Sequence, residues 1–260
     1  MSGERRLLRL GSVAGLIAVW FGVAAVGPDI LPGPLAVALA LVDSVVRPSY
    51  WESILLSTLR VYGAFLVAVA VGVPLGLLIG WSVLFGDFVF PALEMLRPIP
   101  PIAWIPLTIL AIPTLELFVF GEAFAVKSSI VFITFLGAFF PILLNTIEGV
   151  RGIDAEYQRA AETLGADVGQ RFRHVVYPAA LPAIHTGMVV GMGLAWVNLI
   201  AAEMIAGGGL GFLTWSAYTG GSYPIIVVGM ITIGALCYLS SAAIRRLGDY
   251  QLPWMQNATA

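Results

Sequence analysis

Charged and chemically reactive side chains are scarce in this sequence. Asp, Glu, Lys and Arg make up 11% of the 260 residues, whereas soluble domains carry about 25%. Cys237 is the only cysteine, so an intrachain disulfide is excluded. Lys127 is the only lysine and the net charge is −2, which excludes a basic surface for nucleic acid. Two histidines, His174 and His185, are too few for a typical multi-histidine metal site. Val126 precedes Lys127 where a Walker A loop needs glycine, so the chain holds no such ATP site.

Apolar residues are abundant instead. They make up 59% of the chain, and the mean hydropathy is +0.95. The core of a soluble 260-residue protein could not bury so much apolar surface, and too few charged residues would remain to face water. The composition therefore predicts an all-α polytopic membrane protein in which residues 1–260 form a single transmembrane domain.

Six windows are apolar enough to be candidates for membrane-spanning helices. A bilayer core about 30 Å thick requires about 20 apolar residues. The windows are 10–26, 61–83, 88–112, 128–147, 184–205 and 223–243. The third window is unusual, because it contains Glu94 and Arg97 and then four prolines after Arg97, so we expect this span to be interrupted. Between the first two windows, 31–46 predicts a short external helix along the membrane.

The basic residues predict the orientation of these spans. Nine of the thirteen lie before the first window, between the fourth and fifth, or after the sixth: Arg5, Arg6, Arg9, Arg151, Arg159, Arg171, Arg173, Arg245 and Arg246. With six spans, all nine fall on one side, which the positive-inside rule makes the cytoplasm. We therefore expect both termini to be cytoplasmic and the first span to be an uncleaved signal anchor.

The loop 148–182 between the fourth and fifth spans predicts two short amphipathic helices. In the first, Asp154 is placed to cap the N-terminus, and Gly165 follows the last residue, as a C′ residue with positive φ would. Its apolar stripe is Tyr157, Ala160, Ala161 and Leu164. In the second, Asp167 is placed as the cap, and Pro178 predicts an end near Tyr177. Its apolar stripe is Val168, Phe172, Val175 and Val176.

This loop resembles the EAA loop of binding-protein-dependent ABC importer permeases. In that pattern Glu-Ala-Ala is followed by three residues and a glycine, and a proline ends it. Ala160, Ala161, Gly165 and Pro178 match with the spacing intact, and Arg159 stands in place of the glutamate. Further segments are similar to permeases of nitrate, sulfonate, taurine and bicarbonate importers: 97–100, 137–143, Asn145-Thr146, 178–182 and Ala202-Glu203-Met204.

The resemblance implies a permease subunit in the inner membrane of a prokaryote that carries a small anionic solute. It implies two permease chains with the translocation path at their interface, two ATP-binding-cassette subunits inside and a substrate-binding protein outside. We expect a homodimer, with a heterodimer of two related permeases as the alternative. ATP and Mg²⁺ would bind to the ATPase, and this chain would bind no cofactor and have no catalytic residue. Our candidates for coupling with the ATPase combine the matched positions with the apolar stripes: Arg159, Ala160, Ala161, Leu164, Gly165, Val168, Phe172 and Pro178. Without the resemblance, the loop could equally be a pair of interfacial helices on the inner membrane surface.

Ionisable and amide side chains within the spans are candidates for the translocation path. They are Glu94, Arg97, Pro100 beside them, Asn145, Asn198 and Glu203. Each has a structural alternative. Glu94 and Arg97 could neutralise each other three residues apart, and the asparagines could bond neighbouring helices. We expect Glu203 to reach the outer interface, with a gate beside the glycine-rich 207–211 as the alternative, and Arg60 and Lys127 to mark outer span ends.

Two other functional classes remain open from the sequence. An ion-gradient-driven secondary transporter or channel could use Glu94, Arg97 and Glu203 as a proton relay. A polytopic membrane enzyme would have to rely on Ser, Asp and Glu residues dispersed among the spans.

Overall fold

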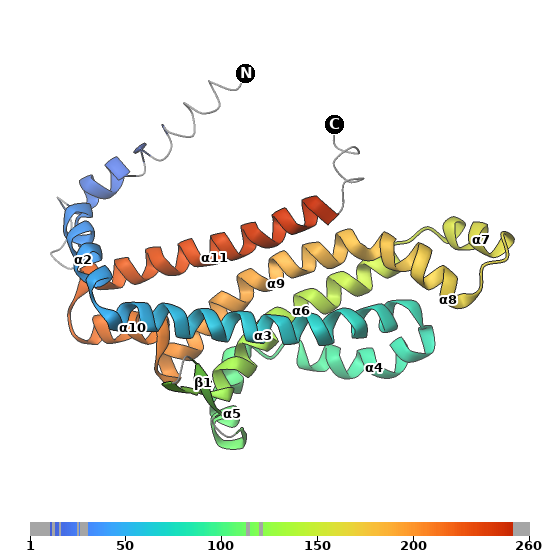
Figure 1. The fold of residues 1–260 in the computed structure, drawn as a ribbon, viewed down its shortest axis with the longest axis horizontal. Helices are drawn as coiled ribbons and strands as arrows, with labels where there is room; N and C mark the ends of the chain where they lie inside the picture. Colours follow the sequence, from blue (N-terminus) through green and yellow to red (C-terminus); the bar gives the residue numbers. More distant parts are fainter. Residues whose placement is uncertain are drawn as a thin grey trace.

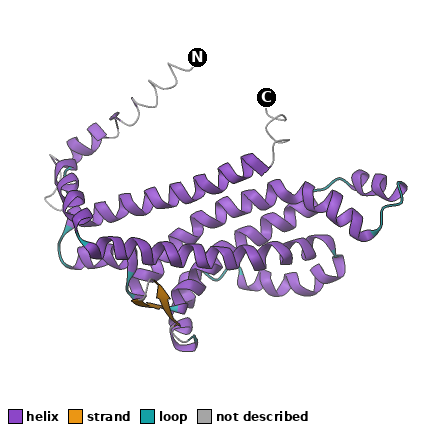
Figure 2. Cartoon of the chain, in the orientation of Figure 1, coloured by secondary structure: helices purple, strands orange, loops and turns teal. Residues whose placement is uncertain are grey.

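The computed structural model describes residues 31–251 apart from 113–114 and 120–121, together with residues 11, 14–15, 17–24 and 26. The prediction of a first span at 10–26 therefore lies partly outside the described residues. Within 31–251 the chain is a bundle of helices with one small hairpin (Figures 1 and 2).

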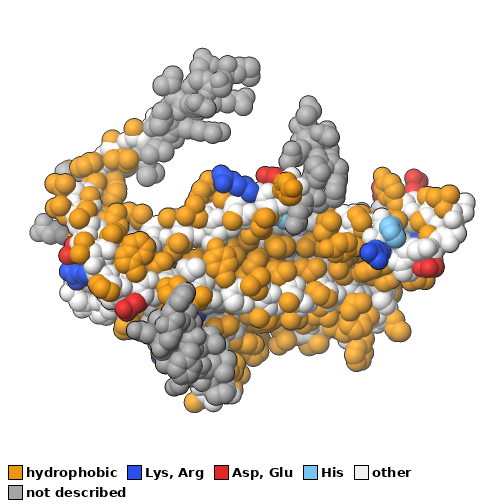
Figure 3. Space-filling view, in the orientation of Figure 1, with side chains coloured by type: hydrophobic (Ala, Val, Ile, Leu, Met, Phe, Trp, Pro, Cys, Tyr) orange, Lys and Arg blue, Asp and Glu red, His pale blue; other side chains and the backbone are white. Residues whose placement is uncertain are grey.

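Four described helices are long and apolar enough to cross a membrane. They are α3 (Pro48–Trp81), α6 (Ser128–Arg151), α9 (Tyr177–Ala206) and α11 (Tyr223–Gln251). They contain the fourth, fifth and sixth predicted windows and all but the last two residues of the second, so the prediction of an all-α polytopic membrane protein is confirmed. Hydrophobic side chains cover much of the visible flank of the bundle, as expected for a surface that faces lipid (Figure 3).

The third predicted span is interrupted, as its prolines indicate. α4 (Val83–Leu96) runs back along α3, and a 3₁₀ turn, η1 (Pro101–Trp104), then leads into α5 (Ile105–Ala111). α2 (Pro34–Val46) confirms the predicted short helix at 31–46. The sequence did not predict the antiparallel hairpin of β1 (Leu115–Val119) and β2 (Glu122–Val126), in which Leu115 pairs with Val126 and Val119 with Glu122.

Small residues bring α3, α6 and α9 into close contact at the centre of the bundle. On α3, glycines recur every fourth residue opposite side chains of α6. A Cβ atom at Gly76 would lie 2.7 Å from Thr146 Cβ, and one at Gly80 would lie 2.6 Å from Val150 Cβ. A Cβ atom at Gly187 of α9 would lie 3.0 Å from the carbonyl oxygen of Pro141 on α6. Such close backbone approach is typical of helices that associate inside a membrane, and it makes these three helices the rigid centre of the fold.

The two ends of the bundle carry different elements. α7 (Ala155–Thr163) and α8 (Val168–Arg171) lie at the end where α6 finishes and α9 begins. α2 and α10 (Gly209–Thr219) lie at the opposite end, beside the first turns of α3 (Figure 1).

Candidate functional site

The loop 148–182 has the glycine turn that the sequence predicts. α7 ends at Thr163 with Leu164 as its C-cap, and Gly165 follows with a φ of +81°. The N–H of Gly165 donates to the carbonyl of Glu162, and the N–H of Ala166 donates to that of Ala161. These bonds close the C-terminus of the helix in the way that a left-handed glycine allows. Asp154 stands at the N-cap position, but its side chain makes no cap hydrogen bond, so that part of the prediction is wrong.

The second helix begins as predicted and ends differently. Asp167 Oδ1 accepts a hydrogen bond from the Gln170 N–H at 2.8 Å, and Gln170 Oε1 accepts one from the Asp167 N–H at 3.0 Å, which completes a capping box. The predicted end near Tyr177 is wrong. The chain continues through a π-helical segment, Phe172–Val176, into α9. There the Tyr177 N–H bonds to the carbonyl of Phe172, five residues back, and this wider turn accommodates Pro178, which has no N–H.

Apolar side chains protrude from α7 and α8. Leu164 is 88% exposed, Tyr157 65% and Val168 58%. By contrast, Phe172 packs edge-on against Trp81 at the end of α3, with ring centroids 5.9 Å apart. The segment is therefore anchored to the bundle on one side and presents an apolar surface on the other. We call the exposed side chains of Tyr157, Ala160, Leu164 and Val168 the coupling surface.

Polar contacts strengthen the anchoring of this segment. The Arg171 guanidinium lies 6.0 Å from the Trp81 ring centroid and forms an ion pair with Glu162 of α7. Arg159, which stands in place of the family's glutamate, is exposed, and its Nε donates to the Ala155 carbonyl at 3.4 Å. Within the described part of the chain Arg159 forms no ion pair, so it is free to meet a partner.

The break in the third span places charged groups on the surface of the chain. Glu94 lies in the last turn of α4, Arg97 is its C-cap and Pro100 precedes η1, and all three are exposed. Together with Phe140, Leu143 and Leu144, Glu94 and Arg97 line a small cavity. Those three residues belong to the central part of α6, so Glu94 and Arg97 lie beside the middle of a helix long enough to cross a membrane. Among the described residues neither side chain forms an ion pair, so the alternative that they neutralise each other is wrong.

The two asparagines bond to their own helices. Asn145 Nδ2 donates to the Pro141 carbonyl and Asn198 Nδ2 to the Leu194 carbonyl, each at 2.8 Å. The alternative that they bond a neighbouring helix has no support among the described residues. Asn198 does lie directly over Gly137 of α6, where a Cβ atom would be 3.0 Å from its Cγ. A role for either asparagine in the path stays a prediction.

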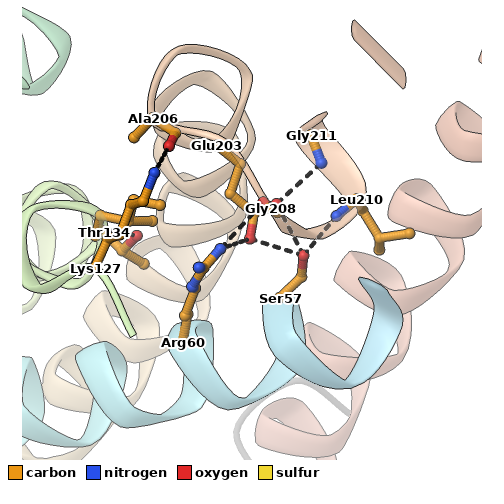
Figure 4. Close-up of polar contacts among 10 residues, drawn as sticks. Ser57, Arg60, Lys127, Thr134, Glu203, Ala206, Gly208, Leu210 and Gly211 are labelled. Atoms are coloured by element: carbon orange, nitrogen blue, oxygen red, sulfur yellow. Dashed lines mark hydrogen bonds and ion pairs between the residues drawn. The ribbon is translucent and has the colours of Figure 1, made fainter. Parts of the chain in front are cut away.

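Glu203 lies in a buried polar cluster rather than at an interface. Its side chain is fully buried, so the expectation that it reaches the outer interface is wrong. Arg60, which is 2% exposed, holds it through an ion pair of 2.9 Å between Nη1 and Oε1. Arg60 lies inside α3, twelve residues after its start at Pro48, and the expectation that it marks the outer end of the span stays a prediction. Ser57 Oγ, one turn before Arg60, donates to the same carboxylate at 2.8 Å (Figure 4).

This cluster also bonds the backbone around the start of α10. Glu203 Oε2 accepts a hydrogen bond from the Gly211 N–H, and Ser57 Oγ accepts one from the Leu210 N–H, both at 2.9 Å. Arg60 Nη1 donates to the Gly208 carbonyl at 3.1 Å. Side chains of α3 and α9 thus satisfy N–H groups that a helix N-terminus leaves unpaired. Lys127, the N-cap of α6, donates to the Ala206 carbonyl at the end of α9 (Figure 4).

Comparison with known proteins agrees with this architecture of long apolar helices. Residues 72–257 match the model of the family described as binding-protein-dependent transport system inner membrane component. An ABC transporter permease protein of Methanocaldococcus jannaschii is 36% identical over 95% of this chain and 92% of its own. The nitrate import permease of Synechocystis is 31% identical over 93% and 88%. The taurine transport permease of Escherichia coli is 31% identical over 95% and 89%.

These features define a multi-pass transport subunit of the inner membrane. The chain belongs to the family of binding-protein-dependent transport system inner membrane components. It is the permease subunit of an ABC importer, a transport component rather than an enzyme, and it works with an ATPase and a substrate-binding component. This membership favours the importer over the gradient-driven transporter that the sequence left open.

Proposed function

We propose that this permease works as a homodimer with two ATPase subunits and an extracytoplasmic binding protein, and that it carries a small anion of the nitrate or sulfonate type. The end of the bundle with α7 and α8 would face the cytoplasm, as would both termini. ATP and Mg²⁺ would bind to the ATPase and not to this chain. The observation that carries the proposal is an apolar coupling surface on a firmly anchored segment.

The coupling surface supports docking of the ATPase. Large apolar side chains that protrude together are typical of a protein interaction site. Gly165 and the capping box at Asp167 fix the angle between α7 and α8, and Phe172 and Arg171 connect them to Trp81 of α3. A force applied at Leu164 would therefore reach α3 directly and α9 through the continuous helix 168–206. The other residues of the proposed coupling segment are Arg159, Ala160, Ala161, Val168 and Pro178.

The break at 97–100 supports a second permease chain. Irregular backbone and ionisable side chains cannot face lipid tails at the middle of a membrane. Glu94, Arg97 and Pro100 are nevertheless exposed on the single chain. A second copy that covers this surface would enclose a polar path between the two chains. Glu94, Arg97 and Pro100 are our candidates for lining it, and Asn145 and Asn198 are further candidates.

The relatives support the substrate class. One is named for nitrate and another for taurine, and taurine carries a sulfonate. We propose that this chain handles anions of the same chemistry, with much of the selectivity held by the binding protein.

We expect uptake to require ATP. The complete transporter would be purified with its partners and reconstituted into liposomes with ATP inside and the binding protein and labelled nitrate, taurine or bicarbonate outside. Uptake of one of these solutes should need ATP in the lumen and persist with an uncoupler. Uptake that does not depend on ATP and is abolished by the uncoupler would identify a gradient-driven transporter instead.

Arg97→Gln should lower this uptake by about tenfold, the effect of about 1.4 kcal/mol on a barrier, because it removes a cation at mid-membrane depth. The ATPase should still co-purify with the variant. Arg47→Gln is the matched control, because Arg47 is 60% exposed and paired with Asp43 near the start of α3. Equal uptake by Arg97→Gln and the native chain would contradict a role for Arg97 in the translocation path.

A further inference from the structure

α10 is attached to the rigid centre of the bundle in an unusual way. It follows α9 after a turn of two glycines and is held at its start by buried polar groups rather than by large apolar side chains. We propose that α10 is a movable gate at the outer end of the permease and that Ser57, Arg60 and Glu203 form the latch that holds it closed. The inference rests on the proposed function, because a gate needs an ATP-driven transport cycle to move it.

A glycine hinge connects α9 to α10. Gly207, Gly208 and Gly209 have φ values of +87°, +80° and +87°. Three consecutive residues in this region are strained for any side chain except glycine. Gly209 also leaves no room for a Cβ atom, because the Glu203 carboxylate lies directly against it. The hinge therefore combines backbone freedom with close contact to the latch.

The buried face of α10 offers little apolar area. Its buried residues are Gly209, Leu210, Gly211, Thr214 and Ala217, of which only Leu210 is a large apolar residue. This face therefore packs against α9 through small residues, and a Cβ atom at Gly211 would lie 2.5 Å from the Ile200 carbonyl oxygen. On the other side, Phe212, Trp215 and Tyr218 are 44%, 42% and 58% exposed.

The latch supplies the contacts that the apolar face lacks. Ser57 and Arg60 project from α3 and Glu203 from α9, so the anchor belongs to the rigid centre. Its three bonds to the moving part all go to backbone atoms: the N–H groups of Leu210 and Gly211 and the carbonyl of Gly208. A small displacement of α10 would break all three and leave the Arg60–Glu203 ion pair in place. The ion pair thus keeps the carboxylate in position for the bonds to form again (Figure 4).

The contact between α10 and α3 contains open space. A cavity of about 390 Å³ lies beside the hinge, and Tyr50 and Ser53 of α3, Gly208, Phe212 and Leu213 are among its lining residues. Helices of the rigid centre are packed without such a gap, as the glycine contacts between α3 and α6 show. The start of α10 therefore has open space beside it on this side.

Distance measurements between spin labels test whether α10 moves. In the complete transporter carrying Cys237→Ser, one label would be placed at Tyr218→Cys on α10 and another at Leu66→Cys on α3, both exposed positions. Labelled chains would be diluted with unlabelled ones so that distances within one chain dominate. We expect a second distance population to appear when ATP and vanadate trap the cycle. The control pair, Leu66→Cys with Val190→Cys on α9, should keep one distance, because both lie on the rigid centre.

Two latch variants separate a gate from a structural ion pair. In Arg60→Glu/Glu203→Arg the ion pair is restored in reverse, but an arginine has no acceptor for the Gly211 N–H. We expect this variant to show the second population without nucleotide. If the swap restores the native distance and native uptake, the ion pair is structural and the gate is contradicted.

Ser57→Ala tests the latch even if the charge swap does not fold, because it removes the acceptor for the Leu210 N–H and keeps the ion pair. It should enlarge the second population in the resting state, and a distribution identical to that of the native chain would contradict the latch.

The proposed function and the gate are contradicted by different results. ATP-independent uptake would overturn the proposed function, whereas ATP-driven uptake with an immobile α10 would overturn the gate alone.

Discussion

Gly165→Val should abolish transport and release the ATPase while the chain still inserts into the membrane. Gly165 has a φ of +81°, and a side chain there would meet no atom within 4 Å. The effect is therefore on the backbone alone, where a non-glycine residue in this region costs about 1–3 kcal/mol and a β-branched one is especially unfavourable. Relief of that strain would change the angle between α7 and α8 and separate Leu164 from Val168. Uptake measures the loss of transport, co-purification measures release of the ATPase, and the amount of the chain in the membrane fraction measures insertion.

A matched control is available at the opposite end of the bundle. Gly221 has a φ of +71° and also no atom within 4 Å of an added Cβ, so Gly221→Val imposes similar strain far from the coupling surface. It should retain the ATPase. Gly165→Asn should retain it as well, because asparagine tolerates this conformation better than other residues. Normal transport by Gly165→Val would contradict the coupling assignment.

Gly76→Leu should prevent the bundle from packing. An added Cβ would lie 2.7 Å from Thr146 Cβ and 2.9 Å from the carbonyl oxygen of Leu143, which is backbone and cannot rotate away. Overpacking a close-packed interior costs about 1–3 kcal/mol for a few methylenes, and a full leucine side chain between α3 and α6 exceeds that. We expect little monodisperse protein in detergent and a lower midpoint of thermal unfolding for what remains.

Gly63→Leu on the same helix is the control. Gly63 is exposed, and an added Cβ would meet nothing within 4 Å. It should therefore match the native chain in yield and thermal stability. If Gly76→Leu also had the yield and thermal stability of the native chain, the close packing of α3 against α6 would be contradicted.

Local sequence patterns predicted most of the fold because they depend on near neighbours. The long apolar windows correspond to α3, α6, α9 and α11. The left-handed Gly165 and the capping box at Asp167 were predictable because every bond that defines them lies within five residues. The prediction of an end at Tyr177 failed because a π-helical turn accommodates the proline that normally ends a helix.

Predictions failed where the partner of a residue is distant in sequence. The second window began at Val61 because Arg60 is charged, yet α3 begins at Pro48. Arg60 can lie inside the helix because Glu203, 143 residues away, neutralises it. Glu203 was expected at an interface because its partner Arg60 is equally distant in the sequence. α10 was missed because glycines at its start indicate a loop, while the groups that cap it come from α3 and α9.

The most direct test of the central claim is a mild-detergent purification of the tagged chain from its native membranes, with mass spectrometry of the proteins that accompany it. The claim is that the coupling surface joins this permease to an ATPase. We predict that an ATPase with a Walker A motif co-purifies in stoichiometric amount and is lost from Leu164→Asp/Val168→Asp, which places charge on the coupling surface. A chain that purifies alone, even after crosslinking in intact cells, would contradict the claim.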